Sequence, residues 1–378
     1  MSNWRYIDEI GVTAAMGLAA DEYLTELYTE DTEAHYPAIL KLYNYKNHSV
    51  LAGRFQDINA EIDIEKCKEL DYGFGRRLTG GGAILMGADQ LGICFTTNQK
   101  EFPWEHIREL YTQLSKPIIE ALSELGINAS FRSKNDLEVN GKKIAGLGVY
   151  VSPRGGIQFH ASLLMDLDIH TMLSVLRIPI QKFSDKRKIA SIEQRITTIR
   201  KEIKNEINMH ELKSIVLKKY AEVFGKTFES IMISPEEQQR IERIAKETYE
   251  SEDWIYQRSP QADMTGMSLK KTPAGLLRTY IGLKGESIKS VLITGDFVDQ
   301  EELLSEIESR LKWSPLDKEY IASVVSQVIG EYKSNGLVSF QLDNDDIVDA
   351  IWLASQRALA EKKYTYNGSC YYPENLNA

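Results

Sequence analysis

The sequence is poor in cysteine and has neither long hydrophobic runs nor an excess of basic residues. Its three cysteines, Cys67, Cys94 and Cys370, are an odd number without metal-ligand spacing. The pattern therefore indicates neither a disulfide framework nor a C-x-x-C metal site. No segment approaches the roughly 18 consecutive apolar residues of a membrane helix, and the N-terminus has no signal-peptide core. These absences predict a reducing, cytoplasmic setting without membrane association.

The charge balance is acidic, with 45 lysines and arginines against 55 aspartates and glutamates and a formal net charge of −10. Surfaces that bind nucleic acid are usually basic, so we expect no nucleic-acid partner. An acidic chain can still bind phosphate groups locally. The length of 378 residues exceeds that of the usual single domain. It predicts two domains, residues 1–250 and 251–378, because the character of the sequence changes near Trp254.

Apolar periodicity predicts a helix over residues 10–29 and a hairpin formed by residues 82–85 and 91–96. Further short strands alternate with helices, and a strand–strand–helix pattern begins near Leu276. Mixed antiparallel strands with helices to one side indicate the α+β class. We therefore expect mixed antiparallel sheets with flanking helices in a large first domain, followed by a small α+β C-terminal domain.

The most informative segment is RRLTGGGAI at residues 76–84, in which three glycines follow a pair of arginines. Glycine has no Cβ, so its backbone can lie against a ligand and expose N–H groups. The guanidinium groups of Arg76 and Arg77 beside such a loop suit a phosphate or a carboxylate. The alternatives are a tight β-turn for the glycines and salt bridges for the arginines.

A second informative segment, KNDLEVNGKKIAG, occupies residues 134–146. Its Asn-Gly pair at 140–141 lies between two alternating runs and predicts a β-hairpin with a type I′ turn. Lys143 would lie on the returning strand close to Gly146, and small residues there leave room for a ligand beside the lysine. The alternative is a surface hairpin with solvated lysines, which we favour for Lys142.

These two segments, with FHASLL at residues 159–164 and SVLAGRFQDINAEID at 49–63, resemble the lipoate-protein ligases. The family patterns are approximately RRxSGGGAVxHD, NDL…KxSG and HHGTLL, and their order is the same here. The resemblance extends from about Glu9 to the C-terminal region. It implies that residues 1–250 form the catalytic domain and that residues 251–378 correspond to the accessory domain of long lipoate ligases.

The resemblance implies a ligase that uses ATP, Mg²⁺ and lipoate. Lipoate would be activated to lipoyl-AMP with release of pyrophosphate and then transferred to a lysine of an acceptor protein. That acceptor would be a lipoyl domain or a protein of the glycine-cleavage H type. Lys143 would be the catalytic residue, contacting the acyl carbonyl and the phosphate, and Asp136 would lie at the metal site. A strand-capping role beside Lys134 is the alternative for Asp136.

The resemblance also implies a set of residues that bind substrate and adenylate: Arg76, Arg77, Gly80, Gly81, Gly82, Ala83, Asn135, Gly146 and His160. For His160, simple packing is the alternative. Residues 178–204, rich in Lys, Arg, Ser and Thr, form either a solvated loop or an ordered loop that covers the ligand. The sequence departs from the family at two histidine positions, which are occupied by Met86 and Phe159, and both changes could alter the acyl pocket.

Three other functions compete with the ligase. One is a lipoyl- or octanoyltransferase that uses a preformed acyl-adenylate or an acyl carrier. The version with a cysteine nucleophile is disfavoured, because the family's cysteine segment is represented here by Ser130, Phe131 and Arg132. A biotin ligase is disfavoured because its basic glycine loop is missing. The last is a non-catalytic paralogue that binds lipoyl-adenylate or an acceptor protein.

Overall fold

The computed structural model describes residues 3–28, 35–132, 135–177, 193–204, 206–297, 301–334, 342–364, 368–369 and 372–373. The chain forms two compact units, Met1–Gln257 and Arg258–Ala378, whereas the sequence placed the boundary at residues 250 and 251. Strands and helices are mixed in both units, and the α+β class is confirmed. The predicted loop at residues 178–204 lies mostly outside the described residues. None of the helices described is long and apolar enough to cross a membrane.

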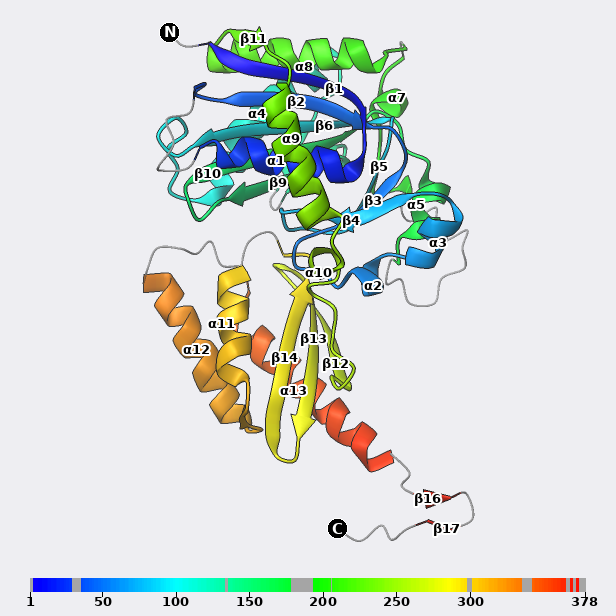
Figure 1. Ribbon diagram of the computed structural model, residues 1–378, viewed down its shortest axis with the longest axis vertical. Helices are drawn as coiled ribbons and strands as arrows, with labels where there is room; N and C mark the ends of the chain where they lie inside the picture. The colour runs from blue at the N-terminus through cyan, green and yellow to red at the C-terminus, as the bar shows by residue number, and fades with distance from the viewer. Residues whose placement is uncertain are drawn as a thin grey trace. The chain divides into compact units, whose positions relative to one another are not determined.

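An eight-stranded sheet forms the centre of the first unit, in the order β11-β1-β2-β6-β10-β9-β8-β7 (Figure 1). Its strands are β1 (Trp4–Val12), β2 (Ile39–Tyr45), β6 (Gln90–Asn98), β7 (Ser130–Arg132), β8 (Asp136–Val139), β9 (Lys142–Val151), β10 (Gly156–Leu164) and β11 (Phe228–Ser230). β1 runs parallel to β2 and β11, and the remaining pairs are antiparallel. The predicted hairpin is formed by β8 and β9. Its turn residues Asn140 and Gly141 have φ of 50° and 78°, as a type I′ turn requires.

A second sheet in this unit has the order β4-β3-β5 and is formed by β3 (Ser49–Ala52), β4 (Gly73–Arg76) and β5 (Ile84–Met86). Helices α2 (Ile58–Glu61), α3 (Ile64–Glu69) and α5 (Ile169–Val175) contribute to the apolar cluster around it. The predicted hairpin of residues 82–85 and 91–96 is wrong, because β5 pairs with β3 while β6 belongs to the large sheet. Alternation identified both strands, but it contains no information about their partners.

Helices cover both faces of the large sheet. Figure 1 shows α1 (Ala14–Glu26) and α9 (Pro235–Ile244) in front of it, and α4 (Ile107–Glu124) and α8 (Met209–Phe224) pack together. A π-helical turn, η1 (Ala245–Tyr249), follows α9. The prediction of one helix from residue 10 is wrong at its start, because residues 10–12 continue β1 and Thr13 caps α1. Pairing of β1 with β2, which reaches Val12 opposite Tyr45, overrides the helical spacing there.

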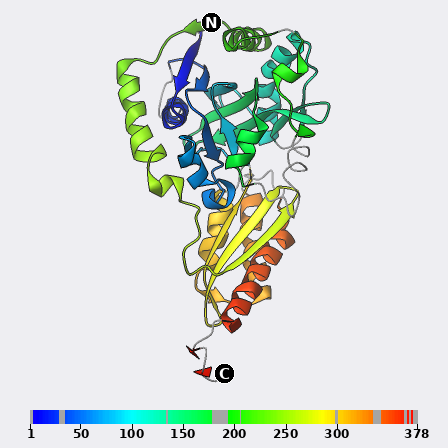
Figure 2. The ribbon, with the colours of Figure 1, turned by 90° about the vertical axis from the view of Figure 1, so that its right-hand side faces the viewer.

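The main sheet of the second unit has the order β12-β13-β14-β15; α11 and α13 pack on it, and α12 packs against these two helices (Figure 2). The elements of this unit are β12 (Gly266–Thr272), β13 (Gly275–Lys284), β14 (Ser287–Gly295), β15 (Ser314–Pro315), α11 (Glu301–Leu311), α12 (Lys318–Ser334) and α13 (Asn344–Tyr364). A short pair, β16 (Gly368–Ser369) and β17 (Tyr372–Pro373), follows α13. The hydroxyl of Ser268 in β12 donates to the carbonyl oxygen of Ala350 in α13 at 2.7 Å, which fixes this helix against the sheet.

Candidate active site

One face of the large sheet, which we call the floor, combines small residues with three larger ones. Two rows of residues paired across β9, β10, β6 and β2 define it: Gly146, Ser162, Gly92 and Tyr43 in the first row, and Gly148, His160, Cys94 and Lys41 in the second. Paired residues in adjacent strands share a face of a sheet. Helix α1 approaches the same face, where the Tyr43 hydroxyl lies 3.3 Å from an oxygen of Asp21. The predicted residues of the hairpin are therefore on the side of α1.

A β-bulge aims Lys143 at this floor. The register of β8 and β9 shifts so that Asp136 pairs with Gly146 but Glu138 pairs with Lys143. A bulge inserts one residue and changes which face the next side chains occupy, so Lys143 shares a face with Gly146 despite their odd separation. The Lys143 ammonium would lie 3.1 Å from a Cβ placed on Gly146. The absence of a side chain at Gly146 thus leaves space for the lysine itself; room for a ligand beside it stays a prediction.

Lys143 and Asp136 form an ion pair with 2.7 Å between Nζ and Oδ1. Both side chains are about a third exposed, at 32% and 29%. Asp136 Oδ1 is nevertheless an atom without a well-aligned hydrogen bond, so the contact is mainly electrostatic. Partial exposure leaves the ammonium able to exchange this carboxylate for a ligand oxygen at modest cost.

The glycine loop, which we define as Gly80–Gly82, is held from beneath by Arg77. One guanidinium nitrogen donates to the carbonyl oxygens of Gly80 and Gly82 at 2.9 and 2.8 Å, and another donates to Leu51. The carbonyls of Gly80 and Gly82 therefore point towards Arg77. The conformation requires glycine, because Gly81 has φ of 93°.

Arg77 also supplies a buried positive charge. Its side chain is 4% exposed, and within the part of the chain that the structure describes its partners are neutral oxygens of Leu51, Thr79, Gly80 and Gly82. Burial lowers the pKa of this guanidinium to about 10, so it stays charged at neutral pH. A buried cation that no carboxylate neutralises favours binding of an anion nearby.

Asn135 connects the glycine loop to the hairpin. Its amide donates to the carbonyl oxygen of Leu147 at 3.2 Å, and Leu147 N–H donates to the Asn135 carbonyl at 2.7 Å. A Cβ added to Gly81 would come within 3.1 Å of the Asn135 amide nitrogen. The structure therefore brings the loop, Asn135, Asp136 and Lys143 into one continuous site.

His160 lies on the same floor in contact with Thr79. The Thr79 hydroxyl is 3.2 Å from Nε2, and the ring occupies space that only Gly148 leaves open, since a Cβ there would be 2.6 Å from Nε2. Burial, and then the charge of Arg77, lower the pKa of His160 to about 3. The imidazole is consequently neutral at physiological pH and can offer one donor and one acceptor.

The low pKa of His160 predicts a pH-dependent stability. Between about pH 6.5, the ordinary value, and about pH 3 the unfolded chain binds a proton at this ring and the folded chain does not. Stability is therefore lost as the pH falls through this window, at up to about 1.4 kcal/mol for each pH unit. In urea titrations at pH 7, 6 and 5, His160→Asn should lose less stability with falling pH than the wild type. A difference between the two proteins that stays constant with pH would contradict a neutral, buried His160.

Arg76 is not brought to the site. It is fully buried, and its guanidinium donates to backbone carbonyls on two segments, Gly53–Gln56 and Trp254–Ile255. Trp254 returns a hydrogen bond from its indole to the Arg76 carbonyl at 2.9 Å. Arg76 thus fastens helix α10 (Glu252–Ile255) to the base of the glycine loop, and it does not face the floor of the site.

Three residues near the motifs belong to packing. Ala83 packs against the apolar cluster of the small sheet, and Met86 is 3% exposed in the cluster that contains Tyr43. Phe159 is fully buried and pairs with Phe95, whose ring stacks on Tyr220 of α8. Phe159 therefore lies on the opposite face of β10 from His160, and this departure from the family pattern does not touch the floor of the site.

Sequence reasoning missed three contributors. Gly53 is required because a Cβ there would be 2.0 Å from the carbonyl oxygen of Gly81, and Thr79 contacts His160 from within the glycine motif itself. Gly53 and Thr79 lie in the two segments that resemble the family, at residues 49–63 and 76–84, and this resemblance is the signal that could have identified them. The third is Thr197, which contacts the backbone of Lys143 and lies in a polar run without any distinguishing signal.

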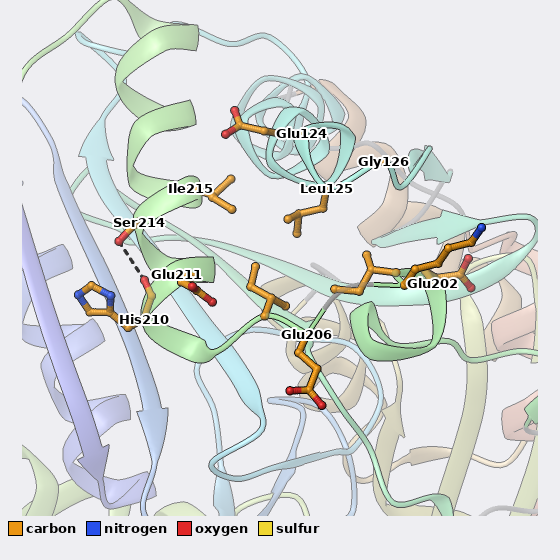
Figure 3. A pocket seen from close by; sticks show the side chains of 12 residues that line it. Glu124, Leu125, Gly126, Glu202, Glu206, His210, Glu211, Ser214 and Ile215 are labelled. Atoms are coloured by element: carbon orange, nitrogen blue, oxygen red, sulfur yellow. Dashed lines mark hydrogen bonds between the residues drawn. The ribbon is translucent and has the colours of Figure 1, made fainter.

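A cavity of about 840 Å³ lies elsewhere in this unit (Figure 3). It is lined by the end of α4, residues 202–204 and 206–207, and the start of α8. Its walls combine apolar side chains such as Leu125 and Ile215 with carboxylates such as Glu124. None of the residues predicted for the site lines it. The floor beside Lys143, where most of the predicted site residues come together, is the better candidate for chemistry.

Comparison with known proteins identifies the family. The model of the lipoyl protein ligase A/B catalytic domain matches residues 13–221, more than half of the chain, and the chain belongs to this family. The predicted family is confirmed, and so is the prediction that this chain is an enzyme.

Curated relatives include two kinds of protein. The chain is 27% identical to lipoate-protein ligase LplJ of Bacillus subtilis strain 168 over 342 residues, covering 89% of this chain and 96% of the relative. It is 25% identical to octanoyltransferase LipM of Geobacillus kaustophilus over 278 residues, covering 68% and 98%. The family therefore leaves a choice between a ligase and a transferase.

Solved structures share the fold. P. falciparum LipL1 in complex with lipoate matches with a TM-score of 0.70 at 17% identity, covering 92% of this chain and 98% of that one. Lipoate-protein ligase A bound with ATP gives 0.57 at 20%, covering 68% and 98%. A bipartite lipoate protein ligase of Thermoplasma acidophilum, solved in a study that includes its E2 lipoyl domain, gives 0.60 at 23%, covering 69% and 98%.

Proposed function

We propose that this chain is an ATP-dependent lipoate-protein ligase whose catalytic domain is the first unit. It joins lipoate to AMP with loss of pyrophosphate and then transfers the lipoyl group to a lysine amine of an acceptor lipoyl domain. The observation that carries the proposal is the position of Lys143. Its ammonium lies over Gly146, pairs with Asp136 and shares one floor with His160.

In the first step a lipoate carboxylate oxygen attacks the α-phosphate of ATP, and pyrophosphate leaves. Negative charge grows on the phosphate oxygens, and Lys143, as a point charge on a flexible stem, can follow these oxygens. Backbone N–H groups of the glycine loop and the buried charge of Arg77 stabilise the same charge without reorganising. Asp136 holds the ammonium in place until the substrates arrive.

In the second step the acceptor amine attacks the acyl carbonyl, and AMP leaves. Charge now develops on the carbonyl oxygen, which Lys143 stabilises in the same way. The neutral imidazole of His160 can hydrogen-bond the substrate without adding a second positive charge beside Arg77. A glycine-cleavage H-type protein is a further acceptor to be tested beside a lipoyl domain.

Magnesium fits this site only as a partner of the nucleotide. Asp136 offers one carboxylate, and the described residues contain no group of three His, Cys, Asp or Glu side chains placed to hold a metal. Mg²⁺ is commonly held by one or two carboxylates together with substrate phosphates, and here it would screen phosphate charge. Asp136 is the residue that would contact it.

The thiol-dependent transferase is disfavoured by the surroundings of the cysteines. Cys94 lies in the floor itself but is fully buried, and burial raises the pKa of its thiol well above the ordinary value. Burial also raises the pKa of Cys67, to about 11. A thiolate is the nucleophilic form, so neither of these two cysteines is prepared for attack on an acyl group. A transferase that uses preformed lipoyl-adenylate is the alternative to be tested.

The deciding experiment is lipoate-dependent release of pyrophosphate from ATP without any acceptor protein. The ligase makes its own acyl-adenylate and should release pyrophosphate only when lipoate is present. If no pyrophosphate appears but synthetic lipoyl-adenylate supports lipoylation of an acceptor, the protein is a transferase. Inactivity in both assays would favour a paralogue that only binds lipoyl-adenylate or its acceptor.

The glycine loop offers a matched pair of variants. Gly82 is exposed and a Cβ there would meet nothing within 4 Å, so Gly82→Ala should change the free energy of unfolding by less than about 0.5 kcal/mol. If substrate lies against the loop, the methyl group should nevertheless raise the KM for ATP or lipoate about tenfold. Gly81→Ala, at φ of 93°, should in addition cost about 1–2 kcal/mol. Unchanged substrate kinetics in Gly82→Ala would remove the loop from the binding site.

A further inference from the structure

The two edges of β9 are paired differently at Lys143. On one side β8 pairs with β9 before and after the bulge. On the other side the pairing of β9 with β10 reaches only Ala145. Beyond that point a short segment of residues 195–197, which we call the strap, takes over. Lys143 N–H donates to the Arg195 carbonyl at 2.7 Å, and Thr197 N–H donates to the Lys143 carbonyl at 2.9 Å, a parallel bridge opposite Ile196.

The strap is itself anchored at its C-terminal end. The Thr197 hydroxyl donates to a carboxylate oxygen of Glu202 at 2.5 Å. The next residue, Thr198, caps α7 (Ile199–Glu202), and Ile199 is fully buried. Thr197 is 2% exposed. Figure 3 shows Glu202 in the wall of the separate cavity, so the anchor lies outside the floor of the site.

We propose that the strap is a positioning element for Lys143 and that Thr197 is its central residue. The inference rests on the proposed function, in which Lys143 is catalytic. A bulged strand whose backbone is bonded on one side only can slip by one residue, and such a slip sends each side chain to the opposite face. With both its N–H and its carbonyl held by the strap, Lys143 keeps its direction towards Gly146 and Asp136.

The strap acts through the backbone of Lys143, and this gives it a distinct kinetic signature. A lysine that is misdirected fails to stabilise the transition state, whereas substrate binding by the glycine loop is preserved. Thr197→Pro removes the N–H that bonds to Lys143, and Thr197→Val removes only the hydroxyl that bonds to Glu202. We expect Thr197→Pro to lower kcat about tenfold with KM changed by less than about twofold. Thr197→Ser keeps both the N–H and a hydroxyl and should retain the wild-type rate.

A readout that requires no activity is competitive labelling of lysine amines, quantified by mass spectrometry of the folded protein. Lys142 is the internal reference on the same strand. In Thr197→Pro the labelling of Lys143 relative to Lys142 should rise about threefold, because local opening exposes the amine, and Thr197→Ser should match the wild type. If Thr197→Pro does not fold, Thr197→Val decides, with a smaller rise expected. An unchanged ratio in the folded variant would overturn the proposal.

A double-mutant cycle separates positioning from general damage. In the Lys143→Ala background, Thr197→Pro should cause no further loss of kcat, because its effect is transmitted only through that lysine. An additional tenfold loss would mean that the strap acts elsewhere. If the wild type releases no pyrophosphate at all, the proposed function fails, but the labelling ratio still reports whether the strap directs Lys143.

Discussion

Lys143→Ala should lower lipoate-dependent pyrophosphate release by about 100- to 1000-fold, the usual effect of removing one group that stabilises transition-state charge. The fold should survive, because the ion pair with Asp136 is about a third exposed and such pairs contribute about 1 kcal/mol or less. The measurement is kcat for pyrophosphate release, together with the free energy of unfolding from a denaturant titration.

Lys142→Ala is the matched control for this prediction. It removes an identical side chain from the adjacent position of β9, which pairs with Val139 rather than with Glu138. We expect kcat within about twofold of the wild type, since surface substitutions away from a site have small effects. Equal losses in both variants would indicate damage to the hairpin, and turnover preserved in Lys143→Ala would remove this lysine from the mechanism.

Arg76→Ala should destabilise the protein by about 3–5 kcal/mol, because several buried carbonyl oxygens lose a charged donor. Arg76→Lys should recover only part of this loss, since one ammonium cannot bond to carbonyls of both Gly53–Gln56 and Trp254–Ile255. The free energy of unfolding of the full chain, measured in urea, tests both variants.

Arg154→Ala is the control for the loss of an arginine. Its side chain is 69% exposed, and its nearest carboxylate, that of Glu26, is 4.0 Å away. We expect a change of less than about 0.5 kcal/mol. If instead Arg76→Ala were as stable as Arg154→Ala while ATP binding weakened strongly, Arg76 would act on the nucleotide, as the family resemblance implied.

Local signals in the sequence predicted local structure well. The Asn140-Gly141 pair specified its turn because both positions need positive φ, and the structure has both. The alternation in the run before this turn also corresponds to its faces, since Leu137 and Val139 are buried and Asp136 and Glu138 are half-buried. The same signals did not predict which strands pair over long distances. β5 and β6, which were predicted to form one hairpin, belong to different sheets.

The adjacent residues Arg76 and Arg77 show how far the sequence could predict the candidate site. In the sequence both are candidates for an anion-binding role, and the family resemblance assigns the phosphates to Arg76. In the structure Arg77 holds the carbonyls of the glycine loop, whereas Arg76 turns to a segment almost 180 residues away along the chain. Successive side chains of an extended strand point to opposite sides, and only the packing of α10 shows that Arg76 is the one that binds the distant segment.

The sequence by itself determined the family and the hairpin. It also singled out the glycine loop and the lysine with its neighbouring aspartate as candidates, because these depend on residue type and short spacing. The tertiary structure decided where the lysine points. Simple alternation along β9 places Lys143 opposite Gly146, and a bulge stabilised between β8 and the strap places them together. A bulge is a property of pairing between segments, and the strap lies more than fifty residues beyond the lysine. Residue types supplied the chemistry of this site, and long-range backbone hydrogen bonds oriented it.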